Sequence, residues 1–190
     1  MSSSDSEDET SGDDIVRVVG CDIYYYGAID RESILTFLEE FRKLEVDLLK
    51  KAIELPGYTP TIQVHIHSEG GDVFSGLSAM DTLRSARVNV TCIAEGNCCS
   101  AATFLLLGGK KRLMSRHSFV LIHQLSTGFF GKYHELKDEM KTCKKIMKTI
   151  KGIYRSETEI PKETLDEFMR KDIYLNFDDC LTYGIVHGAS

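Results

Sequence analysis

The stretch that decides the fold is Gly96-Asn97-Cys98-Cys99-Ser100-Ala101-Ala102-Thr103-Phe104-Leu105-Leu106-Leu107, which follows the apolar run 88–94. It begins with glycine and small residues and ends in a leucine-rich segment of helical length, which predicts a strand, a tight turn and a helix. Such a turn presents its side chain at an exposed corner beside the first free helical N–H groups, and Ser100 occupies that corner. Ser100 is therefore either a nucleophile or a simple helix cap, and this stretch alone favours the cap.

The segments before this stretch alternate between strand and helix patterns. They predict strands at 15–19, 23–26 and 61–67, and helices at about 31–55, capped by Asp30, and at 73–86. The second helix follows the glycine-rich turn Ser68-Glu69-Gly70-Gly71-Asp72. This alternation predicts a layered α/β fold with parallel strand pairing.

The segments after the stretch include one long helix with a narrow apolar stripe. We expect strands at 118–122 and 185–187, a loop or edge strand at 125–131, and helices at 132–155, 162–170 and 178–183. Apolar positions of the longest helix step by three and four residues, and we call this set the seam: Tyr133, Leu136, Met140, Cys143, Met147 and Ile150. A stripe this narrow is typical of helix-on-helix packing, so we expect the helix to project and to meet another subunit.

Composition and charge indicate one globular domain over residues 15–190. The chain has 190 residues with 42% apolar content, which is enough to form a hydrophobic core without disulfides or structural metal ions. Residues 1–14 hold six of the 29 acids and no base, so we expect a disordered acidic tail there. The remaining 23 acids balance 23 bases, and nothing in this balance suggests a nucleic-acid partner.

Cysteine usage and hydropathy indicate a cytoplasmic protein. The six cysteines have no metal-ligand spacing, and several lie in apolar runs, which favours reduced thiols. No stretch approaches a membrane span and no signal sequence opens the chain, so we expect no membrane association. An organelle or the cytosol of a virus-infected host is also compatible with the unusual acidic head.

The residues for serine-based acyl transfer are all present. This chemistry requires a nucleophile, an imidazole base, a carboxylate that orients the imidazole, and N–H donors for the oxyanion. Ser100 at the turn, His123 at a strand end, Asp172 on a connection and the Gly70-Gly71 turn are the candidates. Each of them alone is more often structural than catalytic, so the hypothesis depends on their combination.

From about Tyr24 to Val186 the chain resembles the proteolytic subunit of the caseinolytic (Clp) protease, a serine peptidase family. The matching motifs, in order, are Gly27-Ala28-Ile29-Asp30, Ile66-His67-Ser68-Glu69-Gly70-Gly71, Gly96-Asn97-Cys98-Cys99-Ser100, Leu121-Ile122-His123-Gln124, and Lys171-Asp172 with Tyr183-Gly184-Ile185-Val186. The resemblance implies a crotonase-like spiral of ββα units with a projecting handle helix.

The resemblance also implies roles for individual residues. Ser100 matches the nucleophile, His123 the general base and Asp172 the orienting carboxylate, whereas the N–H groups of Gly71 and Ala101 match the oxyanion hole. The residues that match the substrate-binding strand and its neighbouring turn are Gly70, Leu125, Ser126, Thr127, Gly128 and Phe129. No cofactor or metal is implied.

Assembly and partners follow from the same resemblance. The helix at 132–155 matches the handle through which two heptameric rings stack into a tetradecameric barrel. Family members are fed unfolded polypeptides by a separate hexameric AAA+ unfoldase. The acidic head replaces the apolar residues with which relatives usually touch that unfoldase, and Lys171 replaces an arginine that pairs across the rings. Ala101 and Leu125 likewise replace a methionine and a proline that are common in the family.

Other functions remain open on the residues alone. The same spiral fold hosts acyl-CoA hydratases and isomerases, in which Ser100, His123 and Asp172 would be incidental. A non-catalytic or partner-independent ring subunit and a viral maturation protease are further alternatives. His65 and His67 share a strand face, but no third ligand is spaced to complete a metal site.

Overall fold

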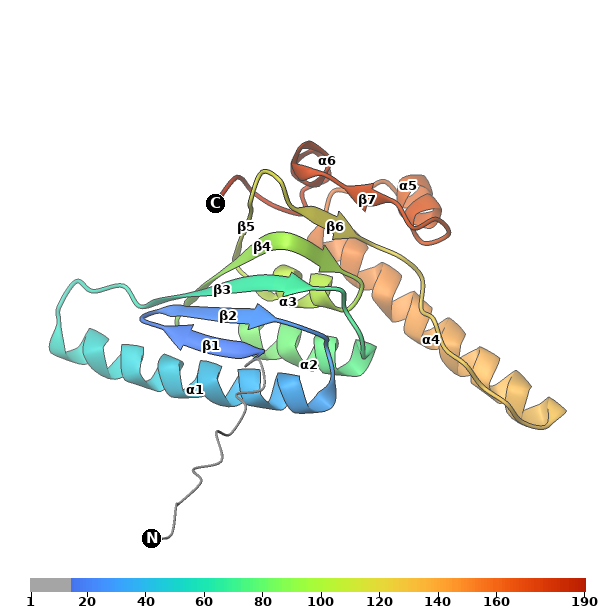
Figure 1. The fold of residues 1–190 in the computed structure, drawn as a ribbon, viewed down its shortest axis with the longest axis horizontal. Coiled ribbons are helices and arrows are strands. Elements are labelled where there is room, and N and C mark those ends of the chain that lie inside the picture. The colour runs from blue at the N-terminus through green and yellow to red at the C-terminus, as the bar shows by residue number, and fades with distance from the viewer. Residues whose placement is uncertain (1–14) are drawn as a thin grey trace, which may run out of the picture.

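The computed structural model describes residues 15–190 and shows a mixed sheet with helices packed against it (Figure 1). The acidic tail expected at 1–14 lies outside the described residues. The strands are β1 (Val16–Val19), β2 (Asp22–Tyr26), β3 (Thr61–Ser68), β4 (Asn89–Cys99), β5 (Lys111–Met114), β6 (Phe119–Leu121) and β7 (Tyr174–Leu175). The helices are α1 (Arg31–Glu54), α2 (Val73–Arg84), α3 (Ala102–Gly108), α4 (Tyr133–Glu157), α5 (Lys162–Phe168) and α6 (Phe177–Thr182). The expected α/β class is confirmed.

The sheet runs in the order β1-β2-β3-β4-β6-β7, with β5 also paired to β4. The pairs from β2 through β3 and β4 to β5 and β6 are parallel, whereas β1 and β7 are antiparallel to their neighbours. On the edge away from β3, β4 has two further partners, because its Thr91–Ala94 half pairs with β5 and its Asn97–Cys99 half pairs with β6. Gly96 lies between the halves at φ +58°, a conformation that glycine adopts without strain. β4 therefore ends at Cys99, five residues beyond the expected strand end.

Helices α1 and α2 lie along the same side of the sheet (Figure 1). Asp30 caps α1 as expected, because its side chain accepts from the Ser33 N–H while the Ser33 hydroxyl accepts from the Asp30 N–H. The apolar face of α1 buries Ile34, Phe37 and Phe41, which fixes the helix on the sheet. All seven residues of α3 are buried, so the leucine-rich segment behind Ser100 forms the centre of the core.

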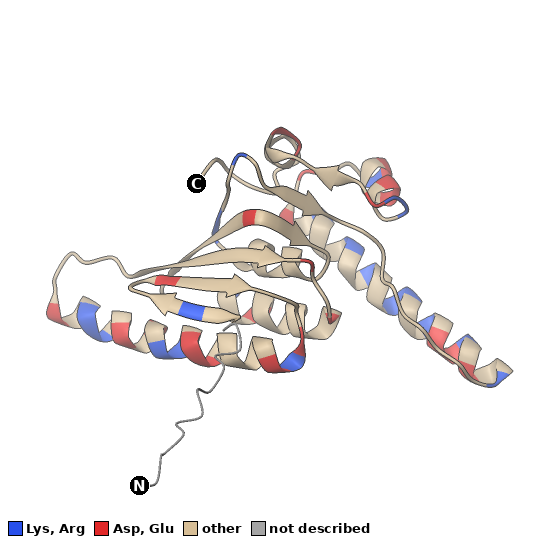
Figure 2. Cartoon of the chain, in the orientation of Figure 1, with Lys and Arg blue, Asp and Glu red and all other residues tan. Residues whose placement is uncertain are grey.

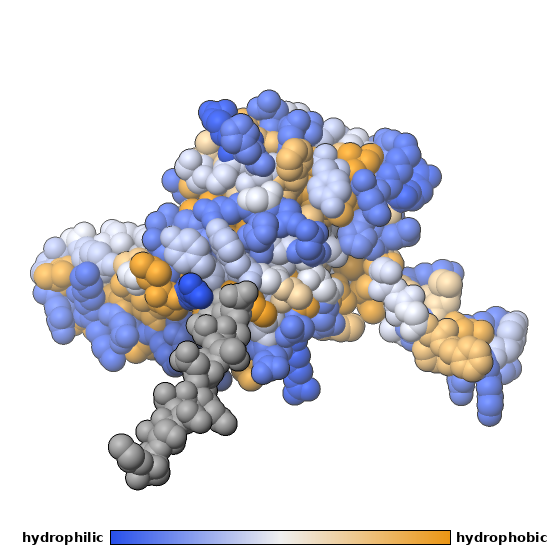
Figure 3. Space-filling view, viewed as in Figure 1, coloured by the Kyte–Doolittle hydropathy of each residue, from blue (hydrophilic) through white to orange (hydrophobic). Residues whose placement is uncertain are grey.

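Helix α4 projects from the body of the molecule, as expected (Figure 1). Ile150 and Tyr154 are its buried residues, whereas Tyr133, Leu136 and Met140 near its start are exposed. Figure 3 shows hydrophobic residues at this free end. Figure 2 shows basic and acidic residues interspersed along α1, whereas on α4 the acidic residues lie mainly near the free end and basic residues continue toward the body. Met147 and Ile150 at the C-terminal end of the seam pack on the core, whereas the first half of the seam is exposed in the described chain.

One expected strand does not form, and one segment left open as loop or edge strand is a loop. Residues 125–131 are extended without strand pairing, so the loop alternative holds. Residues 185–187 are not a strand either; the His187 N–H donates to the Arg112 carbonyl, and a single bridge joins Met114 to Ala189. The closing segment thus attaches to the end of β5 through isolated contacts. Among the described residues, no helix is long and apolar enough to cross a membrane.

Candidate active site

The nucleophile candidate lies on a left-handed turn between β4 and α3. Ser100 has φ +55° and is the one non-glycine residue with a positive φ in the described part of the chain. A non-glycine residue in this conformation costs of order 1–3 kcal/mol, and such residues concentrate at functional sites. The helix-cap alternative is wrong, because Ala101 occupies the N-cap position of α3 and no side chain caps this helix. The Ser100 hydroxyl is therefore not used in capping.

The Gly70-Gly71 turn packs directly against this corner. A Cβ atom on Gly70 would lie 2.6 Å from both the Cys99 carbonyl oxygen and the Ser100 Cβ atom, and one on Gly71 would lie 2.1 Å from the Ile29 carbonyl oxygen. Both glycines also have positive φ, at +92° and +148°. Because Gly70 and Gly71 have no side chains, these backbone segments can pack closely against each other. This close packing restricts both positions to glycine more strictly than the geometry of an isolated turn would.

Two backbone N–H groups near Ser100 have no acceptor. Within residues 15–190, neither the Gly71 nor the Ala101 N–H donates a hydrogen bond to the backbone or to a side chain. The Gly70 N–H, in contrast, donates to Ser68 Oγ, and the Gly70 carbonyl accepts from Ile29. Gly71 and Ala101 both line the cavity described next. These two residues are the expected oxyanion donors, and the arrangement suits that task.

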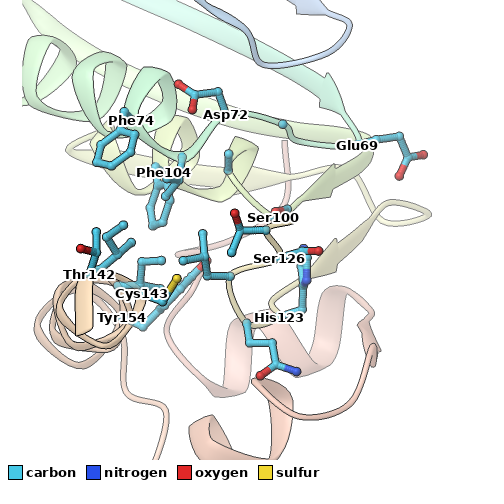
Figure 4. Close-up of a pocket in the computed structure, with 18 of the residues that line it drawn as sticks. Glu69, Asp72, Phe74, Ser100, Phe104, His123, Ser126, Thr142, Cys143 and Tyr154 are labelled. Carbon is cyan, nitrogen blue, oxygen red and sulfur yellow. The ribbon is translucent and has the colours of Figure 1, made fainter. Parts of the chain in front are cut away.

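A cavity of about 500 Å³ opens beside Ser100. It is bounded by the turn before α2, the nucleophile turn, the segment after β6 and the inner side of α4 (Figure 4). The side chains of Thr142, Cys143 and Tyr154 on α4 lie on the opposite side from Ser100 and His123. The lining residues used below are Ser100, His123, Leu125, Ser126, Thr127 and Tyr154. The size and the largely apolar lining are those of a pocket for a small ligand or a single side chain.

Strand pairing brings the triad candidates to one edge of the sheet. The parallel pairing of Cys99 with Leu121, reinforced by the Ser100 N–H donating to the Leu121 carbonyl at 2.8 Å, places Ser100 beside the residues that lead to His123. On the other side of β6, Leu121 pairs antiparallel with Tyr174. The pairing ends there, but the same register extended by two residues would set His123 opposite Asp172.

The side chains of the three candidates are not joined by hydrogen bonds. Among residues 15–190, no bond links Ser100 Oγ to His123 or His123 to Asp172, and Asp172 is exposed outside the cavity. Catalytic hydrogen bonds are often long or misaligned without substrate. The structure thus places Ser100 and His123 in one cavity and leaves Asp172 outside its lining, with no hydrogen bond among the three side chains within residues 15–190.

The expected substrate-binding segment is divided. Leu125, Ser126 and Thr127 line the cavity, whereas Gly128 and Phe129, like Gly70, do not. The Leu125 N–H donates to Met147 Sδ at 3.1 Å, which ties the segment to α4. Because the rest of 125–131 lacks strand partners, its backbone groups remain open to an added strand.

The side chains of Cys98 and Cys99, beside Ser100, pack in the protein interior, as expected. Burial raises the pKa of the Cys99 thiol to about 11 and holds the pKa of Cys98 well above its usual value. A thiol that stays protonated is a poor nucleophile. All six cysteines are free. These two residues therefore do not compete with Ser100 in nucleophilic chemistry.

The histidine pair on β3 belongs to a polar network instead of a metal site. His65 Nδ1 lies 2.8 Å from a Glu95 carboxylate oxygen, and His67 Nδ1 lies 3.2 Å from the Glu95 carbonyl. The Tyr26 hydroxyl also donates to the Glu95 carboxylate. No cluster of three or more metal-ligating side chains occurs in the part of the chain that the structure describes.

Sequence reasoning missed the α4 side of the cavity. Thr142 and Tyr154 line it, as does Cys143, which the seam already contained. Tyr154 follows Ile150 by four residues, so one further step of the seam would have found it. No comparable signal marks Phe74, which reaches the cavity from α2 through tertiary packing.

Comparisons with known proteins agree on one family. A family model described as Clp protease matches residues 24–189. An ATP-dependent Clp protease proteolytic subunit of Deinococcus radiodurans is 34% identical over 127 residues, which cover 66% of this chain and 62% of that protein. A protein of the same description from Epifagus virginiana is 32% identical over 85% of both chains. A chloroplastic ATP-dependent Clp protease proteolytic subunit 1 of Arabidopsis thaliana is 29% identical, again over 85% of both.

Proposed function

Since this chain belongs to the Clp protease family, we propose that it is a serine endopeptidase that hydrolyses peptide bonds through an acyl-enzyme at Ser100. The observation that carries the proposal is the strained left-handed Ser100, which shares a cavity with His123 and with Gly71 and Ala101, whose N–H groups lack acceptors within the described part of the chain. Backbone strain at the half-buried Ser100 does not itself stabilise the fold, so it calls for a functional explanation.

The proposed reaction follows from these positions. His123 takes the hydroxyl proton as Ser100 Oγ bonds to the scissile carbonyl carbon, and the Gly71 and Ala101 N–H groups stabilise the oxyanion. When the oxyanion collapses, the C–N bond breaks and His123 passes the proton to the leaving amine. Water then repeats the sequence, releases the new carboxylate and restores Ser100. Asp172 orients His123 and stabilises its protonated form once the two side chains meet.

The extended segment 125–131 supports a polypeptide substrate. A peptide that adds as a strand gains affinity from main-chain hydrogen bonds, which demand little of its sequence. Leu125, Ser126 and Thr127 would place such a strand along the cavity that holds Ser100. An acyl-CoA hydratase or isomerase would use the two N–H groups but would require no activated serine, so the serine chemistry distinguishes the two classes.

Helix α4 supports a compartmentalised assembly. Its exposed Tyr133, Leu136 and Met140 continue the apolar seam beyond the body of the molecule, where a second copy can cover them. We propose stacked heptameric rings joined through this seam, with a hexameric AAA+ unfoldase supplying unfolded polypeptides. The chemical step itself needs no ATP. A cytoplasmic or organellar location fits these partners.

A non-catalytic ring subunit is the second candidate function. It is favoured by one specific observation, the absence of hydrogen bonds among Ser100, His123 and Asp172 within residues 15–190. In that case the site would stay misaligned in every assembly state.

Labelling with a fluorophosphonate separates these possibilities. The assembled wild-type protein, Ser100→Ala and His123→Ala are incubated with the probe and digested, and adducts are mapped by mass spectrometry. A single adduct at Ser100 that both substitutions abolish supports the peptidase. Hydrolysis of short peptides that persists in Ser100→Ala would show that the mechanism is wrong. A wild type that forms no adduct as intact rings supports the non-catalytic subunit.

A further inference from the structure

A buried chain of hydrogen bonds joins α4 to the nucleophile turn. Thr103 Oγ1 donates to the Ser100 carbonyl oxygen at 2.6 Å, and the Thr103 N–H donates to the same oxygen at 3.1 Å. The Tyr154 hydroxyl hydrogen-bonds to Thr103 Oγ1. Thr103 and Tyr154 are 1% and 2% exposed, so water does not compete for these bonds.

The direction of the chain follows from counting protons. A carbonyl oxygen only accepts, and a threonine hydroxyl carries one proton. Thr103 uses that proton on Ser100, so it must accept from Tyr154. Burial raises the pKa of the Tyr154 hydroxyl, which keeps the phenol protonated as the donor at any pH at which the protein works. The order is therefore Tyr154 hydroxyl to Thr103 hydroxyl to Ser100 carbonyl.

Holding the Ser100 carbonyl also fixes the direction of the Ala101 N–H. The two groups belong to one planar peptide unit, and no cis peptide occurs among the described residues, so the oxygen and the hydrogen point in opposite directions. Ala101 lines the cavity, and a rotation of this unit that loosened the carbonyl would change the direction of the N–H by the same angle. Oxyanion donors stabilise the transition state because their N–H groups are already oriented toward the developing charge. Such a rotation therefore weakens this stabilisation.

We propose that Thr103 and Tyr154 are positioning residues that aim the Ala101 N–H at the developing oxyanion by holding the Ser100 carbonyl. The proposal rests on the proposed peptidase function and extends it to two residues outside the triad. Tyr154 also lines the cavity with its ring. A test must therefore remove the hydroxyl and keep the ring.

The test compares Tyr154→Phe, Thr103→Val, their double variant and Thr103→Ser, with Tyr58→Phe as the control. Tyr58 lies in the connection after α1, outside the cavity lining, so its substitution removes a phenol hydroxyl without touching the chain of bonds. Each variant is checked for assembly by native mass spectrometry. Short-peptide kcat and KM and the rate of fluorophosphonate labelling at Ser100 are then measured.

We expect Tyr154→Phe to lower kcat and the labelling rate by about fivefold and Thr103→Val by about tenfold, with KM unchanged. An interaction that acts only in the transition state lowers kcat and kcat/KM together. Because Tyr154 acts through Thr103, the double variant should be no slower than Thr103→Val. Thr103→Ser, which keeps the hydroxyl, should regain a rate within about twofold of the wild type.

Three results would overturn the proposal. The first is an assembled Tyr154→Phe variant whose kcat and labelling rate equal those of the wild type. Even with a lower melting temperature, this result would show that the hydroxyl makes a purely structural contact. A change in KM alone would indicate that the hydroxyl binds substrate. A wild type that fails to label at Ser100 removes the proposed function and this inference together, whereas a labelled wild type with an unaffected Tyr154→Phe removes the inference alone.

Discussion

Replacing Gly70 by alanine tests whether the approach of two backbone turns builds the site. The added Cβ atom would lie 2.6 Å from the Cys99 carbonyl oxygen and the Ser100 Cβ atom, and 3.0 Å from the Ala101 nitrogen. All three atoms belong to the nucleophile turn, and none is the free end of a flexible side chain. The turn must therefore move away by about half an ångström, which carries both Ser100 and the Ala101 N–H with it.

Gly57→Ala is a matched control for this substitution. Gly57 has φ +89°, against +92° for Gly70, but no atom lies within 4 Å of its added Cβ atom. Both variants incur the backbone strain of a positive φ, which costs of order 1–3 kcal/mol in the free energy of unfolding. The difference between them isolates the effect of the close contact.

Urea unfolding and the rate of fluorophosphonate labelling at Ser100 measure the two effects separately. We expect Gly70→Ala to be the less stable variant and to label at least about tenfold more slowly than Gly57→Ala, because misplacing a reacting group by a fraction of an ångström is costly. Gly57→Ala should label at the wild-type rate. Equal labelling of the two variants would refute the argument that the glycine turn sets the position of Ser100.

Two further predictions concern assembly and pH. The double substitution Met140→Asp and Met147→Asp places carboxylates on the apolar seam of α4, so stacked rings should separate into single rings or smaller species; an unchanged mass by native mass spectrometry would contradict the role of the seam. Although burial acts to raise the pKa of Glu45, the Arg87 N–H and the Arg42 guanidinium hold it below its usual value. Glu45 therefore adds stability above its unfolded-state pKa of about 4.3, and this contribution disappears as pH falls through the folded pKa. Glu45→Gln should lose about 1–3 kcal/mol at pH 7 and progressively less towards pH 3, and a loss independent of pH in urea titrations would count against the charge.

The family resemblance read from the motifs is confirmed, and with it the α/β fold of the crotonase-like kind. The main elements were predictable because their signals are local. Asp30 caps α1 by bonding to the Ser33 N–H three residues away, and apolar residues at steps of three and four identify 132–155 as a helix. The partners, the ring stoichiometry and the roles of the triad remain predictions.

The missed features depend on contacts between distant segments. β4 continues to Cys99 because its second half meets β6, which no pattern within 88–94 announces. Residues 185–187 read as a strand, but the single bridge near Ala189 leaves too little pairing for one. In both cases the pairing available from a neighbouring segment, and not the β-propensity of the residues, determined whether a strand formed.

By itself, the amino-acid sequence determined the order of the helices and of most strands, the glycine-permitted turns and the set of residues able to do serine chemistry, but it did not reveal β5 or β7. These properties follow from backbone sterics and short-range hydrogen bonds, which act over a few residues. Only the tertiary structure decided that Ser100 is left-handed, that the Gly71 and Ala101 N–H groups lack acceptors within residues 15–190, and that Tyr154 reaches Thr103. Each of these depends on packing between segments far apart in the chain, where close contact between buried groups supplies the stabilisation that offsets local strain.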